Sequence, residues 1–222
     1  MEDRNMAFDL PTFQPSLPNL RKELALREQG FRFIAGVDEA GRGAWAGPVA
    51  AAAVILPLDQ PGLVEHLAGL DDSKRLTAAE REQFFGMIQQ TALAVGVGLA
   101  PAELVDEVNV LEATRQAMQQ ALAELSLPPD YLLLDHVWLP AVNLPQDAFP
   151  KADQISLSVA AASVVAKVTR DRLMVQLSQQ YPGYAFERHK GYGTPAHQAA
   201  LASLGPCCLH RRSYSPIKTF SV

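Results

Sequence analysis

Four acidic residues stand at the ends of predicted strands or just before a predicted helix. Asp38 and Glu39 follow the apolar run 33–37, Asp135 closes the run YLLLD, and Asp153 precedes the longest predicted helix. Because strands that end at the same edge of a sheet bring their last residues together, we expect the four carboxylates to converge. Buried carboxylates are costly to keep charged unless a cation lies between them. The pattern therefore predicts a metal site.

The ligand chemistry narrows the choice of metal. Oxygen ligands without His or Cys favour Mg²⁺ or Mn²⁺ over Zn²⁺. Several carboxylates around an accessible site suit two ions about 4 Å apart, an arrangement that cleaves phosphodiesters by activating water and stabilising the leaving oxygen. Taken singly, Asp135 and Asp153 are also typical of ordinary loop acids.

A glycine-rich turn follows the first two acids. Gly41, Gly43 and Gly47 allow the chain to take positive φ and to approach a ligand closely. Residues 41–46 also satisfy the dinucleotide-binding pattern G-x-G-x-x-A. That pattern requires a helix directly after it, whereas a strand-like run follows here. A nucleotide-dependent oxidoreductase is therefore an outlying alternative.

Hydrophobic periodicity and turn residues predict the elements that position these side chains. Strands are expected at 33–37, 49–56, 93–100 and 131–135, and helices at 20–29, 77–90, 110–125, 156–180 and 194–205. The segment 58–69 reads as a loop or weak helix, a short helix follows Pro101, and 137–150 is a loop with room for a short strand. Residues 186–194 read as a polar loop. The order of elements predicts an α/β fold, with a mixed sheet and helices on its faces.

Composition is that of a soluble globular protein, with 48% hydrophobic and 19% charged residues in 222. No apolar run approaches the roughly 20 residues of a membrane helix, and the N-terminus lacks the basic and apolar regions of a signal peptide. Cys207 and Cys208 are adjacent and fit no zinc motif, which indicates reduced thiols. We therefore expect a cytoplasmic protein that does not engage membranes.

Charge is distributed unevenly along the chain. The net charge of −5 argues against a nucleic-acid partner. From Lys151 onward, however, nine Lys and Arg residues face only three Asp and Glu residues. This asymmetry fits either an anionic partner or an accidental surface bias, and charge alone leaves both open.

Seven segments, in this order, resemble bacterial ribonuclease HII: VDEAGRG, DSK, LLLDH, KADQISLSVAAASVVAKVTRDRLM, YPGY, HKGYGT and the GP…HRRSY tail. The resemblance covers residues 33–214. It implies an RNase H-like mixed sheet flanked by helices, with a C-terminal helical extension. We expect an N-terminal arm and short helix over residues 1–30 and a single catalytic domain over 31–222.

The resemblance also implies a reaction. The family hydrolyses the RNA strand of RNA–DNA hybrids and incises 5′ to single ribonucleotides embedded in duplex DNA, leaving 3′-hydroxyl and 5′-phosphate ends. The expected partners are those two substrates, the expected cofactor is Mn²⁺ or Mg²⁺, and the expected state is a monomer. The implied catalytic and metal-binding residues are Asp38, Glu39, Asp135 and Asp153.

Substrate contacts are implied by the same resemblance. Gly41, Arg42 and Gly43 would approach the ribose 2′-hydroxyl, the group that distinguishes RNA from DNA, and Tyr192 would pack against the sugar at the RNA–DNA junction. Phosphate contacts, with a solvated cation as an equal alternative for each, are expected of Lys74, Lys190, Arg211 and Arg212.

Two positions depart from the family pattern. His136 follows Asp135 where members usually have Gly, and it could support a ligand or be a simple loop residue. Tyr214 replaces a Phe of the tail.

Two related alternatives stay open. One is an enzyme restricted to long hybrids, as ribonuclease HIII is, although that type carries an extra N-terminal substrate-binding domain for which the arm here is too short. The other is a non-catalytic nucleic-acid-binding module, against which the complete set of four acids argues.

Overall fold

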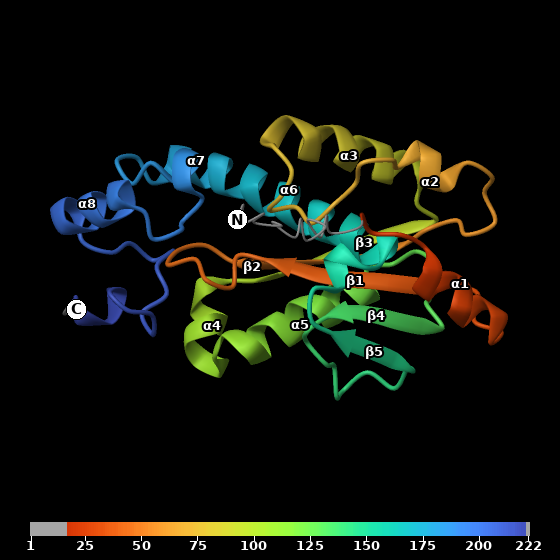
Figure 1. Cartoon of the computed structure of the whole chain (residues 1–222). Helices are drawn as coiled ribbons and strands as arrows, with labels where there is room; N and C mark the ends of the chain where they lie inside the picture. Colours follow the sequence, from red (N-terminus) through yellow and green to blue (C-terminus); the bar gives the residue numbers. More distant parts are fainter. Residues whose placement is uncertain (1–16, 221–222) are drawn as a thin grey trace, which may run out of the picture.

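A five-stranded sheet runs through the molecule, with helices on both faces and a helical C-terminal extension at one end (Figure 1). The computed structural model describes residues 17–220, so most of the predicted N-terminal arm lies outside the described residues. The strands are β1 (Ile34–Ala40), β2 (Val49–Ile55), β3 (Ala94–Ala100), β4 (Tyr131–Asp135) and β5 (Gln146–Phe149). The α-helices are α1 (Arg21–Glu28), α2 (Leu63–His66), α3 (Ala78–Thr91), α4 (Ala102–Val108), α5 (Val110–Ala123), α6 (Leu157–Gln180), α7 (Phe186–His189) and α8 (Pro195–Leu204). Two 3-10 helices, η1 (Ala152–Gln154) and η2 (Ile217–Thr219), complete the described elements.

The sheet is mixed, as the sequence predicts. Its strand order is β3-β2-β1-β4-β5. β1 pairs antiparallel with β2, and β2 antiparallel with β3. On its other side β1 pairs parallel with β4, which pairs parallel with β5. The central strand β1 therefore ends beside β4, the other strand that carries predicted acids.

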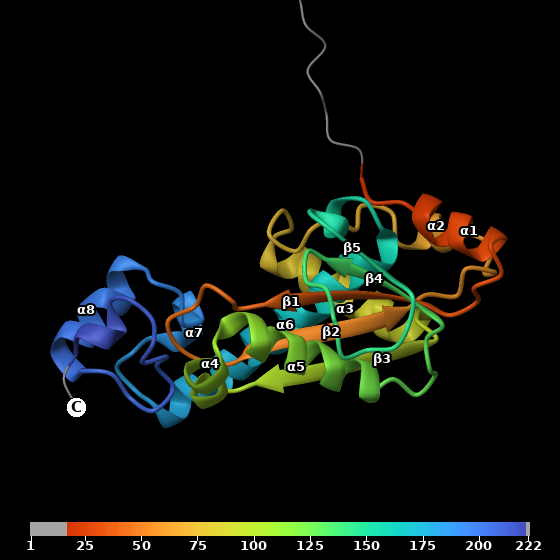
Figure 2. The same ribbon diagram turned by 90° about the horizontal axis from the view of Figure 1, so that it is seen from below.

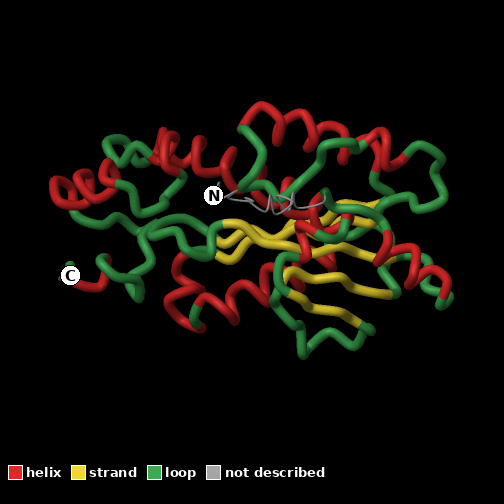
Figure 3. The backbone as a smooth tube through the Cα atoms, in the orientation of Figure 1, coloured by secondary structure: helices red, strands yellow, loops and turns green. Residues whose placement is uncertain are grey.

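Strand β2 shows how the two faces of the sheet are filled. Ala52 and Val54 pack into the core under α6 and α3, whereas Ala51, Ala53 and Ile55 pack into the core under α5. Alternate side chains of a strand point to opposite faces, so a fully apolar strand serves two helical layers at once. Figures 2 and 3 show the strands lying between these helices.

Strand β1 is longer than the sequence predicts. It continues to Ala40 because its ladder with β2 pairs Asp38 with Ala52, Glu39 with Ala51 and Ala40 with Ala50. The prediction that the strand ends at residue 37 was wrong. Both acids therefore lie inside a regular strand and project to opposite faces.

The segment 186–194 is not wholly the polar loop that its composition suggests. Its first four residues form α7, bounded by Ala185 and Lys190 in left-handed conformations. Phe186 is fully buried in a small core with Tyr184 and Met174. Burial of one aromatic side chain thus folds a segment that reads as polar. The short strand expected within 137–150 is confirmed as β5, and the 58–69 segment contains the short helix α2.

Helix α6 lies unusually close to β1. A Cβ atom on Gly36 would lie 2.1 Å from the backbone carbonyl carbon of Ser158. The Ala- and Ser-rich start of α6 is buried and lets the two backbones meet, and the Ser156 hydroxyl caps the helix by accepting the Val159 N–H over 3.2 Å. This contact fixes the start of α6, and with it η1, against the strand that carries Asp38.

We expect Gly36→Ala to lower the free energy of unfolding by about 3 kcal/mol or more, because an added methyl group has no room against backbone atoms. Urea denaturation measures this. The matched control is Gly86→Ala within α3, where a Cβ meets no atom within 4 Å. That variant should gain about 1 kcal/mol from helix propensity. An unchanged midpoint for Gly36→Ala would contradict the close approach.

Candidate active site

Three of the four predicted acids meet at one point. Asp38 comes from β1, Asp135 from the end of β4 and Asp153 from η1, and one carboxylate oxygen of each lies within 4.8 Å of the others. Asp38 and Asp153 are buried, at 3% and 2% exposure. The parallel pairing of β1 with β4 and the docking of α6 on β1 produce this convergence. We call these three residues the acidic triad.

Backbone groups orient two members of the acidic triad. The Glu39 N–H donates to Asp38 Oδ1 over 2.7 Å, and the Ala152 N–H donates to Asp135 Oδ1 over 3.0 Å. Lys151, with φ of 59°, turns the chain into η1 and so directs Asp153. The remaining carboxylate oxygens are left to face one another or a cation.

Electrostatics disfavours leaving this cluster ionised on its own. Burial raises the pKa of Asp38 well above its usual value, and the charges of Glu39, Asp135 and Asp153 raise it further. Burial, followed by the charges of Asp72 and Asp135, raises the pKa of Asp153 to about 7. Such carboxylates take up protons or a cation. Clustered oxygen donors without nitrogen or sulfur suit a hard divalent ion.

Glu39 stands beside the acidic triad rather than in it. Arg42 donates to its Oε1 over 3.2 Å, while its Oε2 is buried without a partner among the described residues. Burial raises the pKa of Glu39, although Arg42 opposes the shift. Strand alternation explains the separation from Asp38, and the unpartnered oxygen is consistent with an added ligand. The assignment of Glu39 as a metal ligand stays a prediction.

Asp72 is a site residue that sequence reasoning missed. It is 5% exposed, accepts the Lys74 N–H over 2.9 Å and accepts from Gln154 Nε2 over 3.3 Å. Its charge and its hydrogen bonding raise the pKa of Asp153. Asp72 is the first residue of the motif DSK, and an acid in that motif was the sequence feature that could have indicated its place in the site. Burial lowers the pKa of Lys74, but the neighbouring carboxylates, Asp72 first, outweigh it and the net shift is upward.

A pocket of about 430 Å³ opens beside Glu39. Its lining contains five of the residues predicted to contact substrate, together with Glu39 and three further residues, whereas Lys190, Arg211 and Arg212 lie outside it. The full lining is Glu39, Ala40, Gly41, Arg42, Gly43, Ser73, Lys74, Lys167 and Tyr192. Lys167, on α6, was not predicted. Its Nζ lies 5.3 Å from the centre of the Tyr192 ring and 2.7 Å from Asp171 Oδ1.

Two buried arginines hold the glycine turn. Arg170 donates to the carbonyls of Pro48 and Ala46, and Arg211 donates to those of Gly47 and Arg42. Arg211 is fully buried, so it is not available for the phosphate contact that was expected of it.

Two other expected phosphate contacts lie on the surface. Arg212 is exposed, and its backbone N–H donates to Asp106 Oδ2. Lys190 donates through Nζ to the carbonyl of Glu187.

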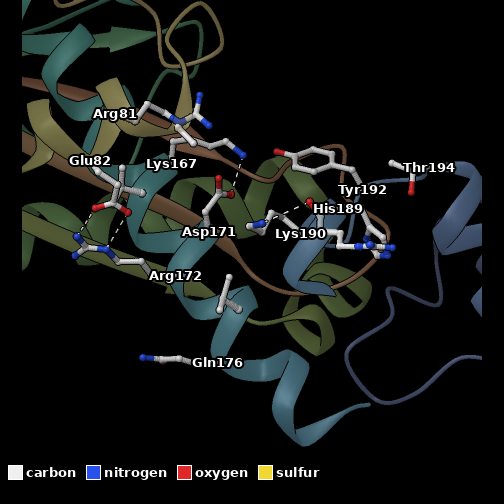
Figure 4. Close-up of a pocket in the computed structure, with 14 residues that line it drawn as sticks. Arg81, Glu82, Lys167, Asp171, Arg172, Gln176, His189, Lys190, Tyr192 and Thr194 are labelled. Atoms are coloured by element: carbon white, nitrogen blue, oxygen red, sulfur yellow. Dashed lines mark hydrogen bonds and ion pairs between the residues drawn. The ribbon is translucent and has the colours of Figure 1, made fainter. Parts of the chain in front are cut away.

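A larger hollow of about 800 Å³ adjoins the pocket and shares Lys167 and Tyr192 with it (Figure 4). In Figure 4 the hydroxyl end of Tyr192 points toward Lys167 on α6. The hollow is lined by more cations than anions. The cations are Arg81, Lys167, Arg172, Arg188 and Lys190, and the anions are Glu82 and Asp171.

Two sequence alternatives can now be judged. No helix follows residues 41–46, because β2 begins at Val49, so the dinucleotide interpretation lacks its structural context. His136 is exposed and has φ of 59°, a left-handed conformation that glycine adopts without strain. This conformation accounts for the Gly usual in the family and favours a loop role for His136.

Comparison with known proteins identifies the family. The sequence model described as Ribonuclease HII matches residues 35–216. The chain belongs to the ribonuclease HII family. It is 52% identical over 196 residues to Ribonuclease HII of Geobacter metallireducens, covering 88% of this chain and 90% of that protein. It is also 52% identical to Ribonuclease HII of Chloroflexus aurantiacus, covering 90% and 95%.

Solved structures share the fold. Ribonuclease H2 from Pyrococcus horikoshii superimposes with a TM-score of 0.69 at 26% identity, covering 85% of this chain and 96% of that one. Ribonuclease HII from Archaeoglobus fulgidus, solved in a complex with PCNA, gives 0.68 at 26%, covering 83% and 96%. Bst-RNase HIII in complex with Mn²⁺ gives 0.63 at 20% identity, with 88% and 71% covered, which supports the fold alone.

Family membership settles the class of enzyme. The chain is a metal-dependent ribonuclease H of type 2, a hydrolase that cleaves RNA strands paired with DNA. Within the described residues, the acidic triad is a cluster that could hold a metal ion. The non-catalytic binding module is set aside. Among residues 17–220, no helix combines the length and apolarity needed to cross a membrane.

The raised pKa of Asp153 predicts a pH dependence of stability. Without metal, the folded state binds a proton between pH 4 and about 7 that the unfolded state has released, because the folded pKa is about 7 and the usual value is 3.8. Stability should therefore fall as pH rises through this window. Urea unfolding with chelator at pH 5 and pH 8 should show Asp153→Asn losing up to about 3 kcal/mol less than the parent protein, because two pH units separate pH 5 from the folded pKa of about 7 and each is worth about 1.4 kcal/mol. Glu124→Gln, an exposed carboxylate at the end of α5, should behave like the parent. Equal losses in all three proteins would contradict the prediction.

Proposed function

We propose that this ribonuclease HII incises duplex DNA on the 5′ side of single embedded ribonucleotides, in addition to cutting the RNA strand of hybrids, and leaves 3′-hydroxyl and 5′-phosphate ends. The observation that carries the proposal is the pocket that joins the turn 41–43, Lys74 and Tyr192 to Glu39, next to the acidic triad. The turn expected to contact the ribose and the aromatic ring of Tyr192 thus line one cavity together with Glu39.

Gly41 and Gly43 of the turn are glycine for different reasons. Gly41 has φ of 93°, and a Cβ there would lie 2.0 Å from Arg170 Nε, so packing alone demands glycine. Gly43 is exposed, and a Cβ there would meet nothing within 4 Å. In the part of the chain that the structure describes, no neighbouring atom requires glycine at position 43. Close approach of a ribose 2′-hydroxyl to its backbone supplies a reason.

Tyr192 supplies the opposite chemistry. Its ring is flanked by Lys167 and Arg170, each 5.3 Å from the ring centre. An aromatic face packs well on a deoxyribose, which lacks the polar 2′-hydroxyl. A pocket lined by both polar backbone and an aromatic ring therefore matches a strand that changes from RNA to DNA.

We propose that Asp38, Asp135, Asp153 and Glu39 hold two divalent ions, Mg²⁺ or Mn²⁺. Such ions, when bound, activate water and stabilise the leaving oxygen of a phosphodiester. The protein contributes the preset carboxylate positions and the side chain of Lys74, which is 74% exposed and 4.0 Å from Asp72, within reach of a phosphate. The excess of cations around the adjoining hollow suits the backbone of a duplex. A single chain carries all of these groups, so we propose a monomer that acts in the cytoplasm.

Cleavage of a labelled DNA duplex with one ribonucleotide, beside an all-RNA/DNA hybrid and with Mg²⁺ or Mn²⁺, tests the proposal. We expect a cut 5′ to the lone ribonucleotide. Asp38→Asn should lose at least about a thousandfold in rate on both substrates while it keeps its circular dichroism spectrum. Cutting of the hybrid alone would replace the proposal with a hybrid-restricted enzyme, and parent-like activity in Asp38→Asn would overturn the metal assignment.

Gly43→Ala separates recognition from stability. Because the protein leaves room for a methyl group at this position, the melting temperature should stay within about 1 °C. Cleavage at the single ribonucleotide should fall at least about tenfold, since the ribose is displaced from the reacting geometry. Gly86→Ala in α3 is the matched control and should cleave normally. Unchanged cleavage by Gly43→Ala would count against ribose contact at this turn.

A further inference from the structure

Three histidines and a cysteine form a buried cluster in the C-terminal extension. His189 is 8% exposed, His197 is fully buried and His210 is 1% exposed. His197 Nε2 and His210 Nε2 lie 3.0 Å apart, and Cys207 Sγ lies 3.2 Å from His210 Nδ1. These histidines and Cys207 take no part in the acidic triad or in the substrate contacts proposed above, so their arrangement requires another explanation.

The partners of His197 and His210 fix the position of each proton. His197 Nδ1 faces the carbonyl of Tyr192 over 3.0 Å, and a carbonyl only accepts, so this nitrogen carries the proton. His197 Nε2 must then accept, which makes His210 Nε2 the donor of that pair. His210 Nδ1 is left to accept the Cys207 N–H over 3.0 Å. A directed chain of hydrogen bonds therefore runs from Cys207 through both rings to Tyr192.

His189 completes a clamp on the loop that carries Tyr192. Its ring stacks on that of His197, with centroids 4.3 Å apart and planes 14° apart. It accepts the Gly191 N–H at Nδ1 over 3.2 Å and donates from Nε2 to the Tyr184 carbonyl over 2.8 Å. The N–H of Gly191 and the carbonyl of Tyr192 are thus each held by one histidine of a stacked pair.

The same tail holds the glycine turn on the other side of the pocket. Arg211 follows His210 directly and donates to the Arg42 carbonyl over 2.8 Å, and the Tyr214 hydroxyl donates to that carbonyl over 2.6 Å. The Arg211 N–H also donates to the Trp45 carbonyl over 2.8 Å. Consecutive tail residues are therefore connected to both parts of the pocket lining: His210 to Tyr192 through His197, and Arg211 directly to Arg42.

We propose, building on the function proposed above, that His197 and His210 are positioning residues: they set Tyr192 relative to the turn 41–43 and thereby set the preference for an RNA–DNA junction over a uniform hybrid. They touch no substrate. They act through the Tyr192 carbonyl and through the tail that also carries Arg211.

The surroundings keep this chain in one protonation state near neutral pH. Burial lowers the pKa of His197 to about 4, with the charge of His189 adding to the effect. Burial and the charges of His197, Arg212 and His189 lower the pKa of His210 to about 4. The rings packed around His197 are those of Trp45, Phe186, His189 and His210, none of them acidic. Neutral rings with fixed tautomers are what a directed hydrogen-bond chain requires.

Two variants of His197 test its two hydrogen bonds separately, because each variant keeps one bond and loses the other. Asn places an amide nitrogen near the position of Nδ1 and can still donate to Tyr192, whereas Gln reaches toward His210 and leaves the Tyr192 carbonyl without this donor. We measure kcat/KM on the single-ribonucleotide duplex and on the hybrid, with Tyr192→Ala as the reference for a lost ring. His66→Asn, on the exposed helix α2, is the matched control.

We expect His197→Gln to lower the ratio of kcat/KM on the single-ribonucleotide duplex to kcat/KM on the hybrid at least about tenfold, with hybrid cleavage little changed. His197→Asn should keep most of the parent protein's ratio. Equal losses on both substrates, or parent-like ratios in Gln, would overturn the proposal in favour of a purely structural role. A parent protein that cuts only the hybrid would instead end the proposed function, and this inference with it.

Nuclear magnetic resonance of ¹⁵N-histidine-labelled parent protein tests the chain without activity. The spectra should show a proton on Nδ1 of His197 and on Nε2 of His210. The opposite tautomer of either ring would overturn the directed chain, whether or not the variants fold.

Discussion

The mutual repulsion of buried carboxylates is the constraint around which this site is organised. Asp38 is nearly inaccessible to water and lies close to two further acids, so its ionised form is disfavoured unless a cation lies nearby. The fold supplies the energy that holds these groups together. The ladder between β1 and β2 keeps Asp38 in a regular strand, and the absence of a side chain at Gly36 lets α6 dock directly on that strand. A site that costs stability without metal is thereby placed on regularly paired and closely packed elements of the fold.

The buried arginines do not pair with the buried acids. Arg170 and Arg211 are fully buried, yet both direct their guanidinium groups at backbone carbonyls rather than at the acids. Arg170 donates to Ala46 and Pro48 after the glycine turn and to Lys190 before Tyr192, so one side chain joins both walls of the pocket. Burial lowers its pKa to about 10, which still leaves it charged near neutral pH. Because these cations are occupied by carbonyls, they do not neutralise the acidic triad, which stays available to a metal ion.

Much of this architecture could be predicted from the sequence, for reasons specific to each element. Apolar runs with clear breakers predict β3, β4 and α6 almost to the residue, because their core faces are continuous. The convergence of Asp38 and Asp135 follows from the parallel pairing of β1 with β4, and η1 at the start of α6 brings Asp153 to them. Other features depend on packing that periodicity does not encode. The extension of β1 to Ala40 comes from pairing with β2, and the folding of α7 comes from the burial of Phe186. Arg211 looks like a surface cation in sequence, since only the folded tail reveals the carbonyls that surround it.

Chemistry and recognition are built on separate parts of the fold. The acidic triad stands on β1, β4 and η1, whereas Tyr192 and His197, which holds its carbonyl, belong to the C-terminal extension. The glycine turn lies between them: it continues from β1, and it is fastened by α6 and by the tail. A change in the extension can therefore alter where the substrate lies without moving the carboxylates. The converse does not hold, because a shift of β1 moves Asp38 and the glycine turn together. With the roles we propose for Tyr192 and the turn 41–43, selectivity is the more adjustable property of this chain, and the geometry of the acids is the more constrained one.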